Sequence, residues 1–180
     1  MKTTVLKFFT LSVAIFAFTN ISFGQGNTSS ATANAGANII TPIGITVDEG
    51  SQLQFGDLIA TSTSYSVTIL PAGTRTSTGN AAFFTETGYS AVSFTVTGEA
   101  GASYNITLPT DSQILLEGAG DDMALTNFKD SKNGSSSISG TTGSYEAGSD
   151  SFTVGATLTV GANQAAGEYS ATFPVTVAYE

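Results

Sequence analysis

The chain of 180 residues contains no cysteine, no histidine and no tryptophan. The absence of cysteine excludes disulfide bonds and a lipid anchor on a cysteine side chain. The absence of histidine removes Ser-His and Cys-His nucleophile pairs, histidine metal sites and the commonest general base near neutral pH. Carboxylate pairs remain for glycoside hydrolysis, but without tryptophan the usual platform for stacking a sugar is missing. We therefore expect no enzyme activity, no metal site and no cofactor.

Basic residues are also scarce, with five Lys and Arg against fourteen Asp and Glu. Two of the five, Lys2 and Lys7, precede an apolar run over residues 8–18, and the small residues Ser22 and Gly24 follow it. The run is too short to span a bilayer, and no stop-transfer pattern follows it. We expect residues 1–24 to be a signal peptide rather than a membrane anchor. The protein is then secreted or placed on the cell surface, with no membrane span after processing.

Removal of residues 1–24 takes away two bases and no acid, which leaves three bases against fourteen acids and a net charge of −11. A chain of this charge does not bind phosphate backbones, so we expect no nucleic-acid partner. The same charge favours solubility and mutual repulsion of folded copies.

Apolar and polar residues alternate through most of the mature chain. Alternation is clear over residues 43–47, 92–96, 104–108 and 152–160, and no window after residue 24 has a period of 3.6. Eight or nine short strands, separated by turns rich in glycine, predict an all-β antiparallel sandwich over residues 43–180. Residues 72–80 are expected to be a turn region, and residues 130–150 a polar loop without periodicity.

Residues 25–42, which we call the arm, precede this domain. In the arm the apolar residues occupy odd positions among Gly, Asn and Ser, a pattern that we call its apolar parity. Pro42 separates the arm from the strand at 43–47. Period-2 patterning favours a thin strand, whereas the composition favours a flexible linker, and the two interpretations have equal support. The residues of the apolar parity are Ala31, Ala33, Ala35, Ala37 and Ile39.

The chain ends in "GEYSATFPVTVAYE", where the large apolar residues keep one parity almost to the last position. This pattern predicts that the terminus is a full strand of the core. Pro174 has no N–H and favours an edge or bulged position for that strand. If Phe173 is fully buried, Phe173→Ala should cost about 3–5 kcal/mol.

The stretch "EGAGDD" gathers Glu117, Asp121 and Asp122 around two glycines. Calcium takes several oxygen ligands from such loops, but the spacing does not match an EF-hand. A solvated acidic turn is the favoured interpretation, with calcium binding as the alternative.

Three segments, "ITPIGITVDEGSQLQFGDLIA", "VSFTVTGEAGASYNITLP" and "FTVGATLTV…AAGEYSATFPVTVAYE", resemble the secreted bacterial proteins of domain-of-unknown-function family 4402. The resemblance covers nearly all of the mature chain. The "LQFG" turn at residues 53–56 and the Gly167-x-Tyr169 terminal strand also resemble pilins of the archaic chaperone–usher class, including spore-coat-U-like domains. In such pilins the C-terminal strand has an aromatic residue next to last and a glycine fourteenth from the end. Tyr179 and Gly167 occupy these places here.

The pilin resemblance implies an immunoglobulin-like fold that lacks its final strand. A periplasmic chaperone fills the gap first, and then the N-terminal arm of the next subunit fills it. The implied function is a cell-surface structural subunit whose partners are copies of itself or related subunits. The implied donor residues are those of the arm's apolar parity. The implied docking strand comprises Gly167, Tyr169, Phe173, Val175, Val177 and Tyr179.

Two other functions stay open at this point. A stand-alone secreted sandwich that binds a surface ligand such as a glycan would need exposed aromatics, and Tyr65, Tyr89 and Tyr145 are the candidates by position. An outer-membrane barrel is disfavoured, because too few strong strands carry the lipid-facing aromatic girdles that a barrel needs. The first alternative would be a complete sandwich, with no gap for another chain to fill.

Overall fold

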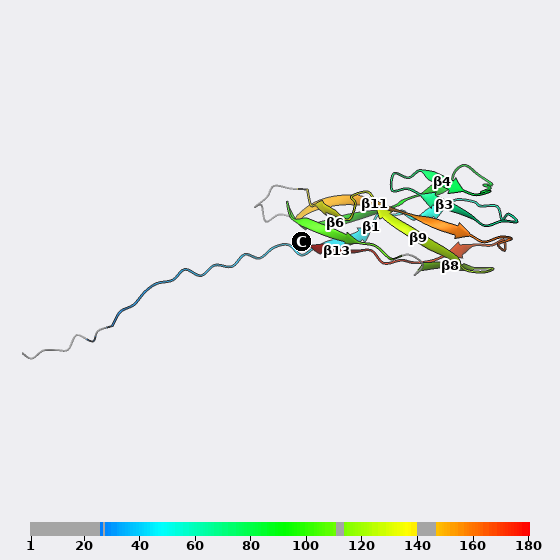
Figure 1. Cartoon of the computed structure of the whole chain (residues 1–180). Coiled ribbons are helices and arrows are strands. Elements are labelled where there is room, and N and C mark those ends of the chain that lie inside the picture. Colours follow the sequence, from blue (N-terminus) through cyan, green and yellow to red (C-terminus); the bar gives the residue numbers. More distant parts are fainter. Residues whose placement is uncertain (1–25, 27, 111–113, 140–146) are drawn as a thin grey trace, which may run out of the picture. The chain divides into compact units, whose positions relative to one another are not determined.

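The computed structural model describes residues 26, 28–110, 114–139 and 147–180, so the predicted leader lies outside the described residues. One compact unit spans Ile39–Glu180, and the described residues before Ile39 belong to a separate unit. The described residues form strands and no helix, and none of them supplies a helix able to cross a membrane. The expected all-β antiparallel fold is therefore confirmed (Figure 1).

The described residues form thirteen strands, and the longest of them, β11, pairs with three others. The strands are β1 (Gly44–Val47), β2 (Gln54–Phe55), β3 (Tyr65–Ile69), β4 (Arg75–Thr78), β5 (Tyr89–Ser90), β6 (Val92–Glu99), β7 (Ser103–Thr107), β8 (Ile114–Gly118), β9 (Met123–Asp130), β10 (Ser135–Ser137), β11 (Ala147–Val160), β12 (Tyr169–Ser170) and β13 (Thr176–Tyr179).

The main sheet has the order β1-β6-β11-β9-β8-β12, and β3 joins it by pairing with β11 and with β4. The first part of β11 pairs with β6, and its last four residues pair with β3. Against β9 the register of β11 shifts between Gly155 and Thr157, which marks a bulge. A three-stranded sheet, β10-β7-β13, and the pair β2-β5 complete the sandwich.

The core consists of two clusters of buried side chains. One gathers around Tyr65, Leu125 and Leu158, and the other contains Phe94 and Phe152, whose rings stack with centroids 5.3 Å apart. These burials confirm the parity predicted for the central strands, whose inward residues are among the most buried of the described chain. The confirmed inward residues are Val92, Phe94, Val96, Tyr104, Ile106, Phe152, Val154, Ala156, Leu158 and Val160.

Two expectations about loops were wrong. The expected turn region at residues 72–80 contains β4, which pairs with β3. The expected polar loop at 130–150 contains β10 and the first residues of β11. Apart from Arg75, the side chains of β4 are exposed, so this strand has no apolar face that a period-2 pattern could reveal.

Candidate functional site

The predicted terminal strand is two short strands with a break between them. Within this C-terminal segment, residues 169–179, β12 pairs with β8 and β13 pairs with β7, and each lies at the end of its sheet. Pro174 lies in the break at residues 171–175, where a residue without an N–H cannot donate to a ladder. Within the described chain neither β12 nor β13 pairs with a second strand, so each has one uncovered edge.

The segment keeps the predicted alternation but is not a full part of the core. Its odd residues, Tyr169, Phe173, Val175, Val177 and Tyr179, are half-buried, while Ala171 and the intervening residues are exposed. The Phe173 ring packs on Phe128, with centroids 5.0 Å apart. The expectation that Phe173 is fully buried is wrong, so a cost of 3–5 kcal/mol no longer applies to Phe173→Ala. The apolar face of this segment is only partly covered.

An open groove of about 890 Å³ lies beside this uncovered edge. One wall is formed by residues 164–173 and the other by residues 51–58, which include β2. Val92 and Phe94 from β6, and Leu158 from β11, form part of the floor. Val47, at the end of β1, also lines the groove, and β1 pairs with β6 on one edge only. The groove thus lies between two strand edges that have no partner among the described residues.

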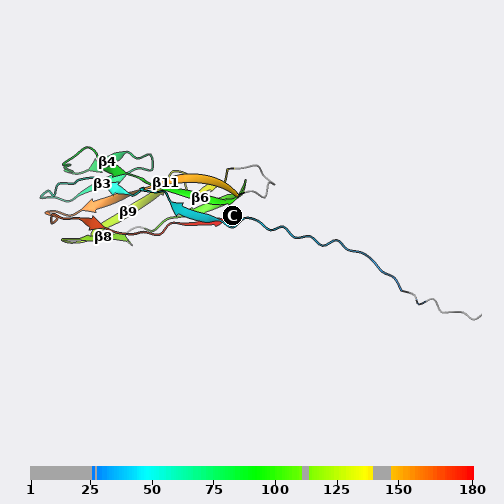
Figure 2. The ribbon, with the colours of Figure 1, turned by 180° about the vertical axis from the view of Figure 1, so that it is seen from behind.

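Just before β1 lies a cluster that we call the Tyr179 clamp, consisting of Thr41, Glu99 and Tyr179. The Tyr179 hydroxyl donates to the Thr41 carbonyl (2.7 Å) and accepts from the Glu99 N–H (2.6 Å). The Glu99 carboxylate accepts from the Thr41 N–H at 2.9 Å. The C-terminus therefore lies where β1 begins, and β1 and β13 are in contact (Figures 1 and 2). Gly98 leaves the space for this hydroxyl, because a Cβ there would overlap it.

In the groove wall formed by residues 164–173, Tyr169 packs on a glycine-rich turn. A Cβ at Gly118 would lie 2.5 Å from the Tyr169 ring, and one at Gly120 would lie 2.8 Å from its hydroxyl. That hydroxyl donates to the Ala165 carbonyl (2.9 Å) and accepts from the Gln164 amide (3.0 Å). The glycines of "EGAGDD" therefore make room for Tyr169, a role that the sequence analysis missed.

The acidic side chains of the same turn, Glu117, Asp121 and Asp122, are all exposed. Among the described residues, no group of three or more acidic side chains is placed to hold a metal ion. Gly167 approaches the turn from the other side, since a Cβ there would lie 2.7 Å from that of Ala119.

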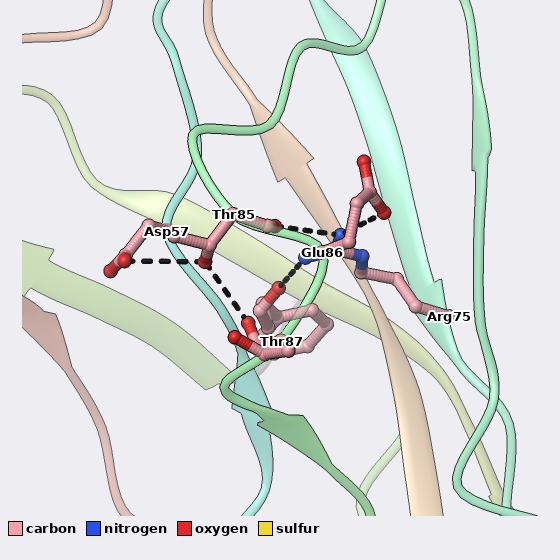
Figure 3. A network of polar contacts seen from close by, with 6 residues as sticks. Asp57, Arg75, Thr85, Glu86 and Thr87 are labelled. Carbon is pink, nitrogen blue, oxygen red and sulfur yellow. Dashed lines mark hydrogen bonds and ion pairs between the residues drawn. The ribbon is translucent and has the colours of Figure 1, made fainter.

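The opposite wall is held by Arg75, whose side chain is only 3 % exposed. Its guanidinium donates to the Thr85 carbonyl (3.1 Å) and forms an ion pair with Glu86 (2.9 Å), as Figure 3 shows. A further bond goes to the Phe55 carbonyl (3.2 Å). It also lies over the rings of Phe83 and Tyr89, 3.8 and 4.5 Å from their centroids. Arg75 thus ties β2 and the loop before β5 to β4.

The three aromatics considered for glycan binding do not form a surface platform. Tyr65 is buried, and its hydroxyl donates to the Ile59 carbonyl, so its expected exposure is wrong. Tyr89 is half-buried beneath Arg75, and Tyr145 lies outside the described residues. Phe84, in contrast, is 78 % exposed.

The arm has no strand in the described residues 28–42. Ala31, Ala33, Ala35 and Ala37 are exposed, as is Ile39, which is 88 % exposed. The even residues of the same stretch are exposed too, so neither face of the arm is buried within the monomer. The apolar side chains at the odd positions can therefore be buried against another surface.

Away from the groove, Asp150 accepts hydrogen bonds from three side chains. They come from the Tyr104 hydroxyl (2.9 Å), the Ser136 hydroxyl (2.8 Å) and the Lys132 ammonium (3.0 Å). Burial alone would raise the pKa of Asp150, but the bonds from Ser136, Lys132 and Tyr104 outweigh it and lower the pKa below 3.8. Burial and the bond to Asp150 raise the pKa of Tyr104. The cluster joins β7, β10 and β11.

Asp150→Asn should lower the free energy of unfolding at pH 7 by about 1–2 kcal/mol, because the bond from Lys132 loses its charged acceptor. A lowered folded-state pKa stabilises the fold above the unfolded pKa of about 3.9, and this stability is lost as the pH falls through the folded value. Urea unfolding at pH 7 and pH 3 should therefore show a smaller acid loss in Asp150→Asn than in the native chain. Exposed Asp121→Asn is the control, and equal acid losses in Asp150→Asn and the native chain would contradict the assignment.

Comparison with known proteins places the whole domain in one family. The family model described as "Domain of unknown function (DUF4402)" matches residues 45–179, which include both walls of the groove. No curated protein and no solved structure matches the chain. Because the match covers three quarters of the sequence, from within β1 to the last residue of β13, the chain belongs to the DUF4402 family.

Proposed function

We propose that the protein is a secreted, pilin-like structural subunit of the cell surface that assembles by strand addition. The arm of one copy enters the groove of another and pairs with the uncovered edge of the C-terminal segment. The observation that carries the proposal is the groove of about 890 Å³ between two strand edges without described partners. An uncovered apolar edge is an aggregation hazard unless another strand covers it.

The arm has the chemistry that such a groove requires. No charged residue occurs between residues 25 and 47, so the arm carries no charge into a domain that is strongly acidic. Extended at about 3.3 Å per residue, residues 28–40 reach roughly 40 Å, which exceeds the length of the 11-residue C-terminal segment. Its small apolar residues bury little area, so backbone pairing with the uncovered edge supplies much of the affinity.

Before assembly the groove needs a temporary cover, and a periplasmic chaperone that lends a strand is the partner that fits this need. The occupant of the finished assembly is a second copy of this chain or a related subunit. Support comes from the half-buried residues Phe173, Val175 and Val177, whose apolar side chains still have area to bury.

The parity of the arm gives a matched test. Ala35→Asp places a charge on the face that enters the groove and should reduce oligomer formation at least tenfold, because a carboxylate is costly to bury unpaired. Asn34→Asp adds the same charge on the opposite face and should change assembly little. Light scattering and size-exclusion of the mature protein measure both, and circular dichroism checks that each variant folds.

Deleting residues 25–38 should abolish assembly and leave the unit Ile39–Glu180 folded. A peptide of residues 26–40 should then raise the melting temperature of the shortened chain in proportion to its occupancy. Equal assembly of Ala35→Asp and Asn34→Asp, or of the shortened chain and the native one, would contradict strand addition. A monomer that is instead stabilised by a glycan would favour the ligand-binding alternative, since the groove volume lies in the range of ligand pockets.

A further inference from the structure

We infer that the Tyr179 clamp keeps the arm out of the groove of its own chain, so that strand addition takes place only between chains. The inference rests on the proposed function and adds that the arm pairs with another chain rather than with its own. Thr41 is the residue where the arm meets the domain, and both of its backbone groups are held. Its N–H donates to the Glu99 carboxylate, and its carbonyl accepts from the Tyr179 hydroxyl.

The course of β1 explains why this matters. β1 begins at Gly44, opposite Thr97, and runs toward Val47, which lines the groove. To enter its own groove, the arm would have to reverse within the few residues before β1 and lie back along it. Only Pro42 and Ile43 separate the held Thr41 from β1.

A tight reversal at this place competes directly with the clamp. A turn that begins at Thr41 would use the Thr41 carbonyl to accept from the Gly44 N–H, with Pro42 at the position that proline favours. That carbonyl accepts from Tyr179, and the Thr41 N–H is held by Glu99, so the backbone of Thr41 would have to rotate out of the clamp for this turn to form. The sequence at residues 41–44 is therefore compatible with a tight turn, and the clamp prevents that turn from forming.

The clamp is also built to hold its position. The Tyr179 hydroxyl is fixed from a second side by the Glu99 N–H, and Gly98 provides the space in which it sits. Register adds to this, because β13 pairs Tyr179 with Tyr104, a fully buried residue of β7. The penultimate residue of the chain thereby controls the first residues of the domain.

The absence of cysteine from the chain permits a direct test. Ala171, which is exposed and lines the groove, is replaced by cysteine together with one arm alanine at a time: Ala31, Ala33, Ala35 or Ala37. After mild oxidation, cross-links between chains are separated from cross-links within a chain on a non-reducing gel. With the native clamp, we expect cross-links between chains in excess over those within a chain by tenfold or more.

Tyr179→Phe keeps the ring and removes both hydroxyl contacts, and it should raise the share of cross-links within a chain at least fivefold. Glu99→Ala, which frees the Thr41 N–H, is the second variant if Tyr179→Phe fails to fold. Thr46→Ala, at an exposed position of β1, is the control. Unchanged shares in both clamp variants, or cross-links mainly within the native chain, would overturn the inference while strand addition stands. No cross-link from any arm position would overturn the proposed function as well.

Discussion

Replacing Arg75 with methionine is expected to lower the free energy of unfolding by about 3 kcal/mol. Methionine keeps much of the apolar stem, but the Phe55 and Thr85 carbonyls lose a charged donor, and hydrogen bonds to charged groups contribute about 1.5–3 kcal/mol each. The contacts of the guanidinium with the Phe83 and Tyr89 rings are lost as well. Urea unfolding at neutral pH measures the change.

Two companion variants identify which contact of Arg75 matters. Glu86→Gln should change stability by less than about 0.5 kcal/mol, because the Glu86 side chain is 84 % exposed and such ion pairs are screened by water. Arg75→Lys should fall between these results, since one ammonium cannot reproduce the planar donor set. A loss in Glu86→Gln equal to that in Arg75→Met would show that the ion pair, not the carbonyl contacts, holds this wall.

Gly155→Ala is expected to cost about 3 kcal/mol or more. Gly155 lies at the bulge of β11, where a Cβ would overlap the Ile69 carbonyl oxygen and lie 2.9 Å from the Leu70 carbonyl carbon. The obstacle is backbone rather than a flexible side chain, so β3 and β11 would have to move apart. Forcing atoms into a packed core usually costs 1–3 kcal/mol, and here four paired residues of β3 depend on the contact.

Gly44→Ala is the matched control for this prediction. Gly44 is also a strand glycine, but its nearest neighbour is the Thr97 hydroxyl at 3.1 Å, which can rotate away. We expect a change of less than about 1 kcal/mol, or a slight gain from the reduced freedom of the unfolded chain. Chemical denaturation of both variants gives the comparison, and similar losses at the two positions would refute the close approach of β11 to β3.

The sequence predicted the parts of the fold that have an apolar face. The inward residues of β6 and β11, such as Phe94 and Phe152, follow from period 2, because a half-buried strand cannot hide its pattern. β4 was not predicted, because its exposed hydroxyl side chains give no such pattern. It is a strand only through its pairing with β3. Its one informative residue, Arg75, acts through the Phe55 and Thr85 carbonyls, and such contacts leave no periodic signal.

The candidate site was predictable in outline. The C-terminal parity was visible, but its half-burial was not, because burial depends on which strand lies alongside, and period 2 says nothing of that. From the sequence, the glycines of the acidic turn indicate only a turn. In the structure, Gly118 and Gly120 must lack a side chain because Tyr169 lies against them. The clamp joins residues 138 positions apart, a separation that no local pattern can report.

The late position of β11 has a consequence for how a growing chain behaves. β3 and β6 both take β11 as a neighbour, yet the residues that pair with β3 are made about ninety positions after it. Until residue 160 has emerged, these two apolar strands have no central partner, and a partly synthesised chain exposes them. Such non-local pairing gives a high contact order, so folding is expected on the millisecond-to-second scale. Synthesis at about 5–20 residues per second leaves the first two-thirds of the chain waiting for several seconds, with its apolar edges open to other chains.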